Sequence, residues 1–254
     1  MFRKILGKKK QVVSRRKPSG VADARAYAIG DIHGRLDLLR DLIDRIDADR
    51  RARPCARDYI VFLGDLIDRG PDSAGVIDFL LAERDRLTHP IFIMGNHEEM
   101  LLRILDGDVG QFRDWIQYGG YECAQSYGVE VGKLSALDDA DGAALLRKAV
   151  PDAHRAFIRD FADSFQFGDY LFVHAGIRPG VAIREQKVED LRWIRQGFLD
   201  SSANHRVIVV HGHTISDGPD EQANRIGIDT GAYTSGILTA LCIDGTERTY
   251  LATR

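Results

Sequence analysis

Three short apolar runs along the chain share one design. Each run ends at a glycine and is followed at once by polar side chains that can bind metals: residues 26–30, 59–64 and 91–95. Short apolar runs of this kind, bounded by turn signals, are typical of buried strands. In open α/β sheets, ligands bind outside the carboxyl ends of the strands. We therefore expect the residues that follow the three runs to share one site.

The segments between these runs predict helices. From Arg35 to Ile46 apolar residues recur at spacings of three and four, which is helical, and residues 50–57 form a charged loop. The unit is β-α-β, so its two strands are expected to be parallel with a right-handed crossover. A second helix follows Pro71-Asp72-Ser73, and a third begins near Glu98.

Residues 107–165 have a different character. Helical composition appears at 140–149 and 153–165, while residues 118–121 and 126–128 have the composition of turns. Strands then dominate, and we expect them at 170–173, 206–210, 225–228, 237–243 and 249–251. Helices concentrated early and strands late predict an α/β (mixed α+β) fold class in which two packed β-sheets are flanked by helices, with 107–165 as a helical insertion.

Charge separates the N-terminus from the rest. Residues 1–17 contain eight Lys and Arg and no acid, whereas the remainder carries a formal charge of −11. Residues 1–24 are expected to be a disordered tail, and nucleic-acid binding is not favoured because aromatic residues do not alternate with these charges. No apolar run has the length of a membrane span or signal peptide. Three widely spaced cysteines fit neither a disulfide framework nor a zinc-thiolate site, which favours a cytoplasmic location.

The polar residues after the predicted strands have the chemistry of metal ligands. Six are candidates: Asp31, His33, Asp65, Asn96, His174 and His213. Carboxylate and amide oxygens with imidazole nitrogens suit Mn, Fe or Zn, and a two-metal site clamps the attacking and leaving oxygens of a displacement. A glycine–aspartate pair after a strand is usually only a turn. Here six candidates occur together, each after a predicted strand, which favours the dinuclear site.

Five short motifs occur in order: Gly30-Asp31-Ile32-His33-Gly34, residues 64–70, Gly95-Asn96-His97-Glu98, His174-Ala175-Gly176 and Gly212-His213-Thr214. Together they resemble the calcineurin-like metallophosphoesterases, and within them the bacterial and phage serine/threonine protein phosphatases. The resemblance covers about residues 25–245. It implies a single metallophosphoesterase domain at 25–254, two bound metal ions, manganese being favoured, and a metal-bridging hydroxide as the nucleophile.

The resemblance also implies a role for each side chain. Asp31 and His33 would bind the first metal, Asp65 would bridge both, and Asn96, His174 and His213 would bind the second. His97 would be the general acid, oriented by Asp68. Arg69 would hold phosphate oxygens from one side, and Arg195, rather than its neighbour Arg192, would hold them from the other.

The substrate is a separate question. The Asp68-Arg69 pair and Glu98 after His97 resemble the protein-phosphatase form of the motifs, which favours a phosphoprotein or phosphopeptide substrate. The alternative is a dinucleoside-polyphosphate (diadenosine tetraphosphate) hydrolase of the same superfamily. A non-catalytic binding protein is a remote alternative, because it would predict eroded ligands. The sequence predicts no oligomeric state.

Overall fold

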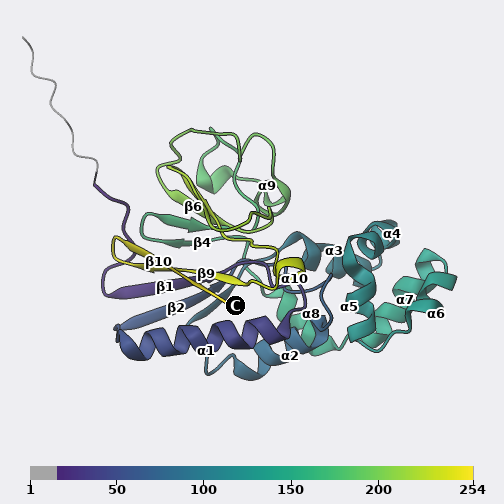
Figure 1. The fold of residues 1–254 in the computed structure, drawn as a ribbon. Helices are drawn as coiled ribbons and strands as arrows, with labels where there is room; N and C mark the ends of the chain where they lie inside the picture. Colours follow the sequence, from purple (N-terminus) through teal and green to yellow (C-terminus); the bar gives the residue numbers. More distant parts are fainter. Residues whose placement is uncertain (1–15, 254) are drawn as a thin grey trace, which may run out of the picture.

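The computed structural model describes residues 16–253, which form two packed β-sheets with helices on their outer faces (Figure 1). The first sheet has five strands in the order β10-β9-β1-β2-β3. Its strands are β1 (Ala24–Ile29), β2 (Arg57–Phe62), β3 (Pro90–Phe92), β9 (Thr239–Asp244) and β10 (Glu247–Ala252). Strands β1, β2 and β3 are parallel, whereas β9 runs antiparallel to β1. The predicted β-α-β unit is confirmed.

The second sheet also has five strands, in the order β4-β5-β6-β8-β7. These strands are β4 (Phe165–Phe167), β5 (Tyr170–Phe172), β6 (Ile208–His211), β7 (Asp220–Glu221) and β8 (Arg225–Gly227). Strands β5, β6 and β8 are parallel, and the edge strands β4 and β7 are antiparallel to their neighbours. Two mixed sheets packed together confirm the predicted fold class.

The alternation of side chains along β1 and β2 separates two of the three apolar cores that the described residues form. Successive strand residues point to opposite faces of a sheet. On β1, Tyr27 and Ile29 join the core beneath the helices, whereas Ala26 and Ala28 join the core between the sheets. The small alanine side chains leave room for the larger residues of the second sheet, among them Phe172.

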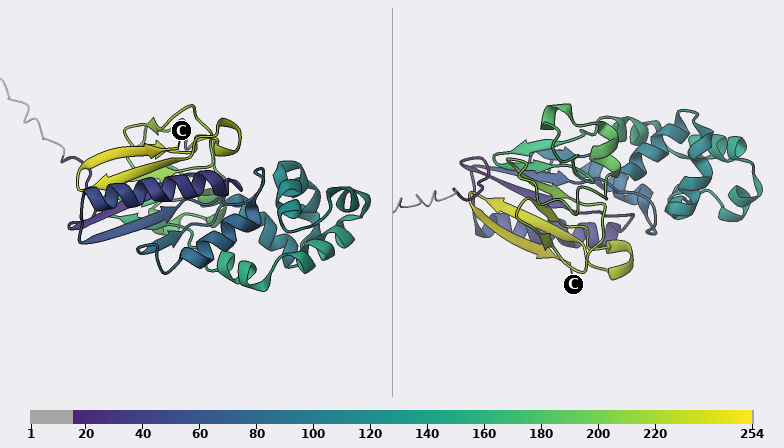
Figure 2. Two further views of the ribbon diagram at one scale, coloured as in Figure 1. Left: turned by 60° about the horizontal axis from the view of Figure 1, so that its bottom comes forward. Right: turned by 90° about the horizontal axis from the view of Figure 1, so that it is seen from above.

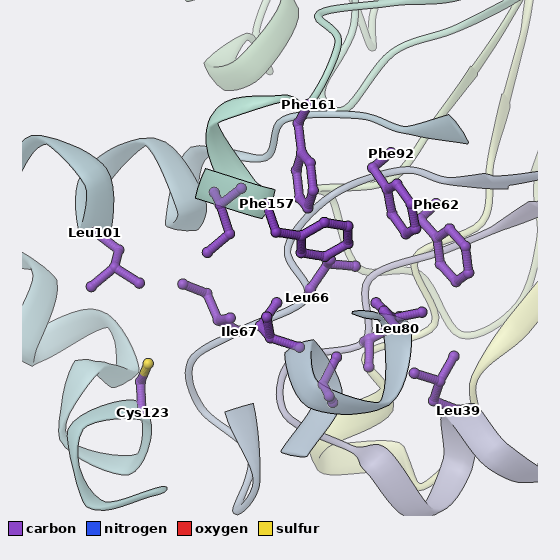
Figure 3. Packing of buried hydrophobic residues seen from close by; sticks show 14 of the residues in the cluster. Leu39, Phe62, Leu66, Ile67, Leu80, Phe92, Leu101, Cys123, Phe157 and Phe161 are labelled. Atoms are coloured by element: carbon purple, nitrogen blue, oxygen red, sulfur yellow. The ribbon is translucent and has the colours of Figure 1, made fainter. Parts of the chain in front are cut away.

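Helices α1 (Leu36–Ala52) and α2 (Ser73–Glu83) cover the outer face of the first sheet, whereas α3 (Asn96–Leu105) lies beyond the end of the sheets and packs against the short helices that follow it. Four phenylalanines pack together in this layer (Figure 3). The rings of Phe62 and Phe92 are stacked with centroids 4.8 Å apart, and Phe157 and Phe161 pack against Phe92. This cluster packs α8 (Asp152–Arg159) against the edge of the sheet.

The expected helical insertion is a group of short helices beyond one end of the sheets (Figures 1 and 2). Its elements are η1 (Val109–Gln111), α4 (Phe112–Trp115), η2 (Ile116–Gly120), α5 (Tyr121–Ser126), α6 (Val131–Ala136), α7 (Asp139–Ala149) and α8 (Asp152–Arg159). The turn expected at residues 118–121 is a kink between two short helices. Gly119, at φ 108°, breaks the helix regularity there, and the chain continues directly into α5.

Other element boundaries also differ from expectation. Helix α1 continues to Ala52, so the predicted loop begins later, and ion pairs such as Arg50 with Asp47 support its last turns. Short elements such as η3 (Ile183–Glu185), α9 (Val188–Trp193) and α10 (Ala232–Ser235) are too brief to leave a periodic signal. Between residues 16 and 253, no helix combines the length and apolarity needed to cross a membrane.

The predicted tail falls partly within the described residues. Residues 1–15 lie outside them. The backbone N–H of Ser19 donates to Asp169 at 2.8 Å, and that of Gly20 donates to the carbonyl of Gly245 at 2.8 Å. This part of the predicted tail thus lies against the turns that join β4 to β5 and β9 to β10.

Candidate metal centre

The six parallel strands of the described residues end on the same side of the two sheets. At least one candidate metal ligand follows each strand. Asp31 and His33 follow β1, Asp65 follows β2, and Asn96 follows β3, while the second sheet supplies His174 after β5, His213 after β6 and Asp229 after β8. The first six of these are the predicted ligands, and all lie buried. Asp229 was missed, although it also directly follows a predicted strand, which is the signal that identified the others.

The loops that carry these side chains turn sharply. Eight non-glycine residues of the described chain have positive φ, and five of them are predicted site residues: His33, Asp65, Asp68, Arg69 and His213. A left-handed backbone is unfavourable for residues with a Cβ and is retained mainly at functional sites. The loops are therefore shaped to direct side chains inward at some cost in stability.

Asp65 lies at the centre of the cluster. Its Oδ2 is 3.6 Å from His33 Nε2, and its Oδ1 is 3.4 Å from His174 Nε2. Two groups of possible metal ligands share this carboxylate: His33, Asp65 and His97 form one, and Asp65, His174 and His213 form the other, with ligand atoms within 4.8 Å of one another in each. The predicted bridging carboxylate is thus the one that the two groups have in common.

Backbone carbonyls orient two of the imidazoles. His33 Nδ1 lies 2.8 Å from the carbonyl oxygen of Ile67, and His174 Nδ1 lies 2.8 Å from that of Leu63. Each Nδ1 therefore donates a proton to its carbonyl, and Nε2 is the ring atom that faces Asp65 and would bind a metal. Metal-binding histidines in proteins are held in the same way.

Three buried carboxylates, those of Asp31, Asp65 and Asp229, lie close enough together for their negative charges to repel one another. Asp31 accepts the backbone N–H of His213 at 3.0 Å, and burial, followed by the charges of Asp229 and Asp65, raises its pKa well above the ordinary value. Burial also raises the pKa of Asp65, but the charges of His174 and His97 outweigh that effect and hold it well below the ordinary value. Buried carboxylates packed this closely require cations beside them for charge balance.

The uncharged candidate ligands His213 and Asn96 are also suited to binding a metal. Burial and the nearby His174 lower the pKa of His213 to about 2, so its imidazole is neutral and able to bind a metal. Asn96 Oδ1 lies 2.9 Å from His174 Nε2, close to the second group of donors. The donor set of carboxylates, one amide and imidazoles fits a pair of divalent or trivalent ions.

His97 is held by a second acidic residue and by the helical insertion. Its Nδ1 lies 2.6 Å from Asp68 Oδ2, as the sequence predicted. Trp115 Nε1 donates to the same oxygen at 2.8 Å, and this tryptophan is completely buried. Burial lowers the pKa of His97, but Asp65 and then Asp68 outweigh it and raise the pKa. No local pattern links Trp115 to Asp68 in the sequence.

Glu98 organises the loop after β2. Its carboxylate accepts the backbone N–H groups of Asp65 at 2.9 Å, Leu66 at 2.7 Å and Gly95 at 3.0 Å. Burial, followed by the charge of Asp65, raises the pKa of Glu98 to about 7. Glu98 thus links the loop after β2 to the loop after β3 through hydrogen bonds to their backbones.

The two predicted arginines lie on different sides of the cluster. Arg69 Nη1 is 2.9 Å from His33 Nε2, and Arg195 Nη2 donates to the carbonyl of His213 at 3.1 Å. Arg192 is instead engaged by Asp163 at 2.6 Å and Glu99 at 3.4 Å. Of the two neighbours, Arg195 is therefore the one placed beside the candidate ligands.

Comparison with known proteins agrees with this arrangement. The sequence model of the calcineurin-like phosphoesterases matches residues 24–234 of the chain. An asymmetrical bis(5'-nucleosyl)-tetraphosphatase of Halalkalibacterium halodurans is 26% identical over 233 residues, which cover 84% of this chain and 87% of the relative.

Other similarities are more local or more distant. A symmetrical bis(5'-nucleosyl)-tetraphosphatase of Cellvibrio japonicus is 41% identical, but over only 81 residues, so the chain matches 27% of that relative's length. A crystal structure provisionally assigned as a diadenosine tetraphosphatase superimposes with a TM-score of 0.63 at 20% identity, covering 92% of this chain and 95% of the other. A cold-active protein tyrosine phosphatase gives a TM-score of 0.58 at 18% identity, covering 91% and 81%.

Proposed function

Since this chain belongs to the calcineurin-like phosphoesterase family, we propose that it hydrolyses dinucleoside polyphosphates of the diadenosine tetraphosphate type at the candidate metal centre. The observation that carries the proposal is the similarity to the asymmetrical bis(5'-nucleosyl)-tetraphosphatase, which extends over 84% of the chain. The sequence motifs favoured a protein phosphatase, with the dinucleotide hydrolase as the alternative. The comparisons favour that alternative.

The proposed metal ligands are the six predicted from the sequence: Asp31, His33, Asp65, Asn96, His174 and His213. Two bound ions would supply an activated water at neutral pH and neutralise phosphate charge. Asp65 would be shared between the ions, in keeping with its central position. The carbonyls of Ile67 and Leu63 keep two imidazoles in the tautomer that such ligation needs.

The proposed acid is His97. Because its Nδ1 is held by Asp68, its Nε2 is the atom left to give a proton to the leaving oxygen. Arg69 and Arg195 would hold phosphate oxygens from opposite sides, and the planar guanidinium group suits this contact because it stays charged and can donate two parallel hydrogen bonds.

A second candidate function is protein phosphatase activity, and the His97–Asp68 pair is the observation that favours it. An alkoxide, such as the one released from phosphoserine, is a poor leaving group and benefits strongly from a positioned acid. A nucleotide leaves through a phosphate oxygen, which needs protonation much less. The well-oriented His97–Asp68 pair therefore favours a phosphomonoester substrate.

A parallel assay distinguishes the two candidates. Purified protein loaded with manganese would be given diadenosine tetraphosphate and a phosphoserine peptide, and kcat/KM would be measured for each. We expect the higher kcat/KM for the dinucleotide. A higher value for the peptide would reverse the assignment in favour of the protein phosphatase.

A further inference from the structure

A cleft of about 620 Å³ opens directly beside the candidate metal centre. It lies between the start of α1, the loop after β2 and the start of α10, and three arginines line it: Arg35, Arg40 and Arg69. We call it the arginine cleft. Its volume lies in the range of sites that bind nucleotides and other ligands of that size.

The arginine cleft is continuous with the metal centre. Arg69 forms part of its wall and also lies 2.9 Å from His33 Nε2. Tyr233, which also lines the cleft, packs beside Arg69: its ring centre lies 5.0 Å from the guanidinium carbon of Arg69 and 5.3 Å from the ring centre of His33. A substrate with its reacting phosphate at the centre would therefore extend past Arg69 and Tyr233 into the cleft.

The charges in the cleft differ in how far they are already neutralised. Arg35 is held by Asp37 at 2.7 Å and by the carbonyl of Ala232 at 2.8 Å, so it is fixed and paired. The other acid, Asp72, accepts the backbone N–H of Gly75 at 2.8 Å and caps α2.

Arg40 is different, because it has no acidic partner within residues 16–253 and its guanidinium carbon lies 5.4 Å from the centre of the Phe79 ring. Arg69 likewise makes no ion pair among the described residues, where its guanidinium contacts His33, the carbonyl of Tyr118 and the ring of Tyr233. The cleft thus has one positive charge beside the centre and another farther out. This arrangement matches a chain of phosphates more closely than a single phosphate group.

We propose that the arginine cleft binds the phosphates that follow the reacting one in a polyphosphate chain, with Arg40 as the outer contact. The nucleotide half of a dinucleoside polyphosphate is the corresponding part of the substrate, and this identification rests on the proposed function. The binding of a linear polyphosphate to Arg40 does not depend on it. Arg40 is in this account a specificity-determining residue that lies outside the catalytic centre.

The test compares Arg40→Gln with the wild type and with Arg45→Gln. Arg45 lies on the same helix, is partly exposed and is paired with Asp41 at 2.9 Å, so its replacement controls for the loss of one charge from α1. The assay is hydrolysis of p-nitrophenyl phosphate at a fixed free manganese concentration. Inhibition constants are measured for tripolyphosphate and for orthophosphate.

We expect Arg40→Gln to raise the inhibition constant of tripolyphosphate roughly threefold to tenfold, the range spanned by exposed and charge-assisted contacts. Inhibition by orthophosphate and kcat/KM for the aryl phosphate should not change, and Arg45→Gln should behave as the wild type. An unchanged tripolyphosphate constant in Arg40→Gln, or equal changes for both inhibitors, would overturn the proposal.

Turnover of diadenosine tetraphosphate by the wild type is measured beside this assay. If the dinucleotide is not hydrolysed but Arg40→Gln still weakens tripolyphosphate binding selectively, the proposed function fails and the cleft assignment holds. If the dinucleotide is hydrolysed and Arg40→Gln changes nothing, the proposed function holds and the cleft assignment fails.

Discussion

Replacing Asp65 with asparagine is expected to lower kcat/KM for every phosphate ester roughly 10³-fold, because metal ions contribute several kcal/mol of transition-state stabilisation and 1.4 kcal/mol corresponds to tenfold in rate. The carboxylate of Asp65 lies within 3.4–3.9 Å of three imidazole Nε2 atoms, those of His33, His97 and His174. Asparagine keeps the shape of the side chain but offers only one oxygen, without the negative charge, so it cannot serve two ions equally.

The matched control for this variant is Asp41→Asn, which removes a carboxylate from the surface of α1 and should leave kcat/KM unchanged. Manganese titration adds a second readout. We expect Asp65→Asn to bind fewer manganese ions or to bind them more weakly, while its circular dichroism spectrum stays that of the wild type. An Asp65→Asn protein with more than a tenth of the wild-type activity would contradict the bridging role.

Replacing His97 with asparagine is expected to lower kcat on alkyl phosphates by roughly 10²–10⁴-fold, the usual contribution of a positioned acid. Aryl phosphates and diadenosine tetraphosphate should be affected much less, since their leaving groups need less protonation. Kinetics on a series of phosphates with leaving groups of graded pKa measures this directly. Equal losses across the series would remove His97 from the acid role.

Trp115→Phe extends the same experiment to the residue that supports the acid. The substitution keeps an aromatic ring in the core but removes the hydrogen bond from Nε1 to Asp68. We expect a smaller loss than in His97→Asn, of roughly tenfold, with the same dependence on the leaving group. A uniform loss on all substrates would show that Trp115 acts only through packing.

Much of the metal centre could be predicted from the sequence, for a local physical reason. Each ligand follows the end of a strand, and the alternation of buried strands and glycine turns is visible in a few consecutive residues, as in Gly64-Asp65. Because the parallel strands of both packed sheets have their carboxyl ends on the same side, residues as distant as Asp31 and His213 meet there. Their roles as metal ligands remain predictions.

The supporting residues could not be predicted in the same way. Trp115 reaches Asp68 only through the path of residues 107–165, and the turn-like composition of residues 118–121 predicts the kink at Gly119 but not the short helices on either side of it. The arginine cleft likewise joins the start of α1 to Tyr233, nearly two hundred residues later. Contacts between such distant residues depend on tertiary packing and leave no periodic signal along the chain.

The most direct test of the account is anomalous diffraction at a manganese-sensitive wavelength from crystals grown with manganese. We expect two peaks about 3.5–4 Å apart, with the carboxylate of Asp65 between them, one beside Asp31 and His33 and the other beside His174. A single peak, or peaks away from these side chains, would contradict the claim that the ends of the two sheets together hold a pair of metal ions.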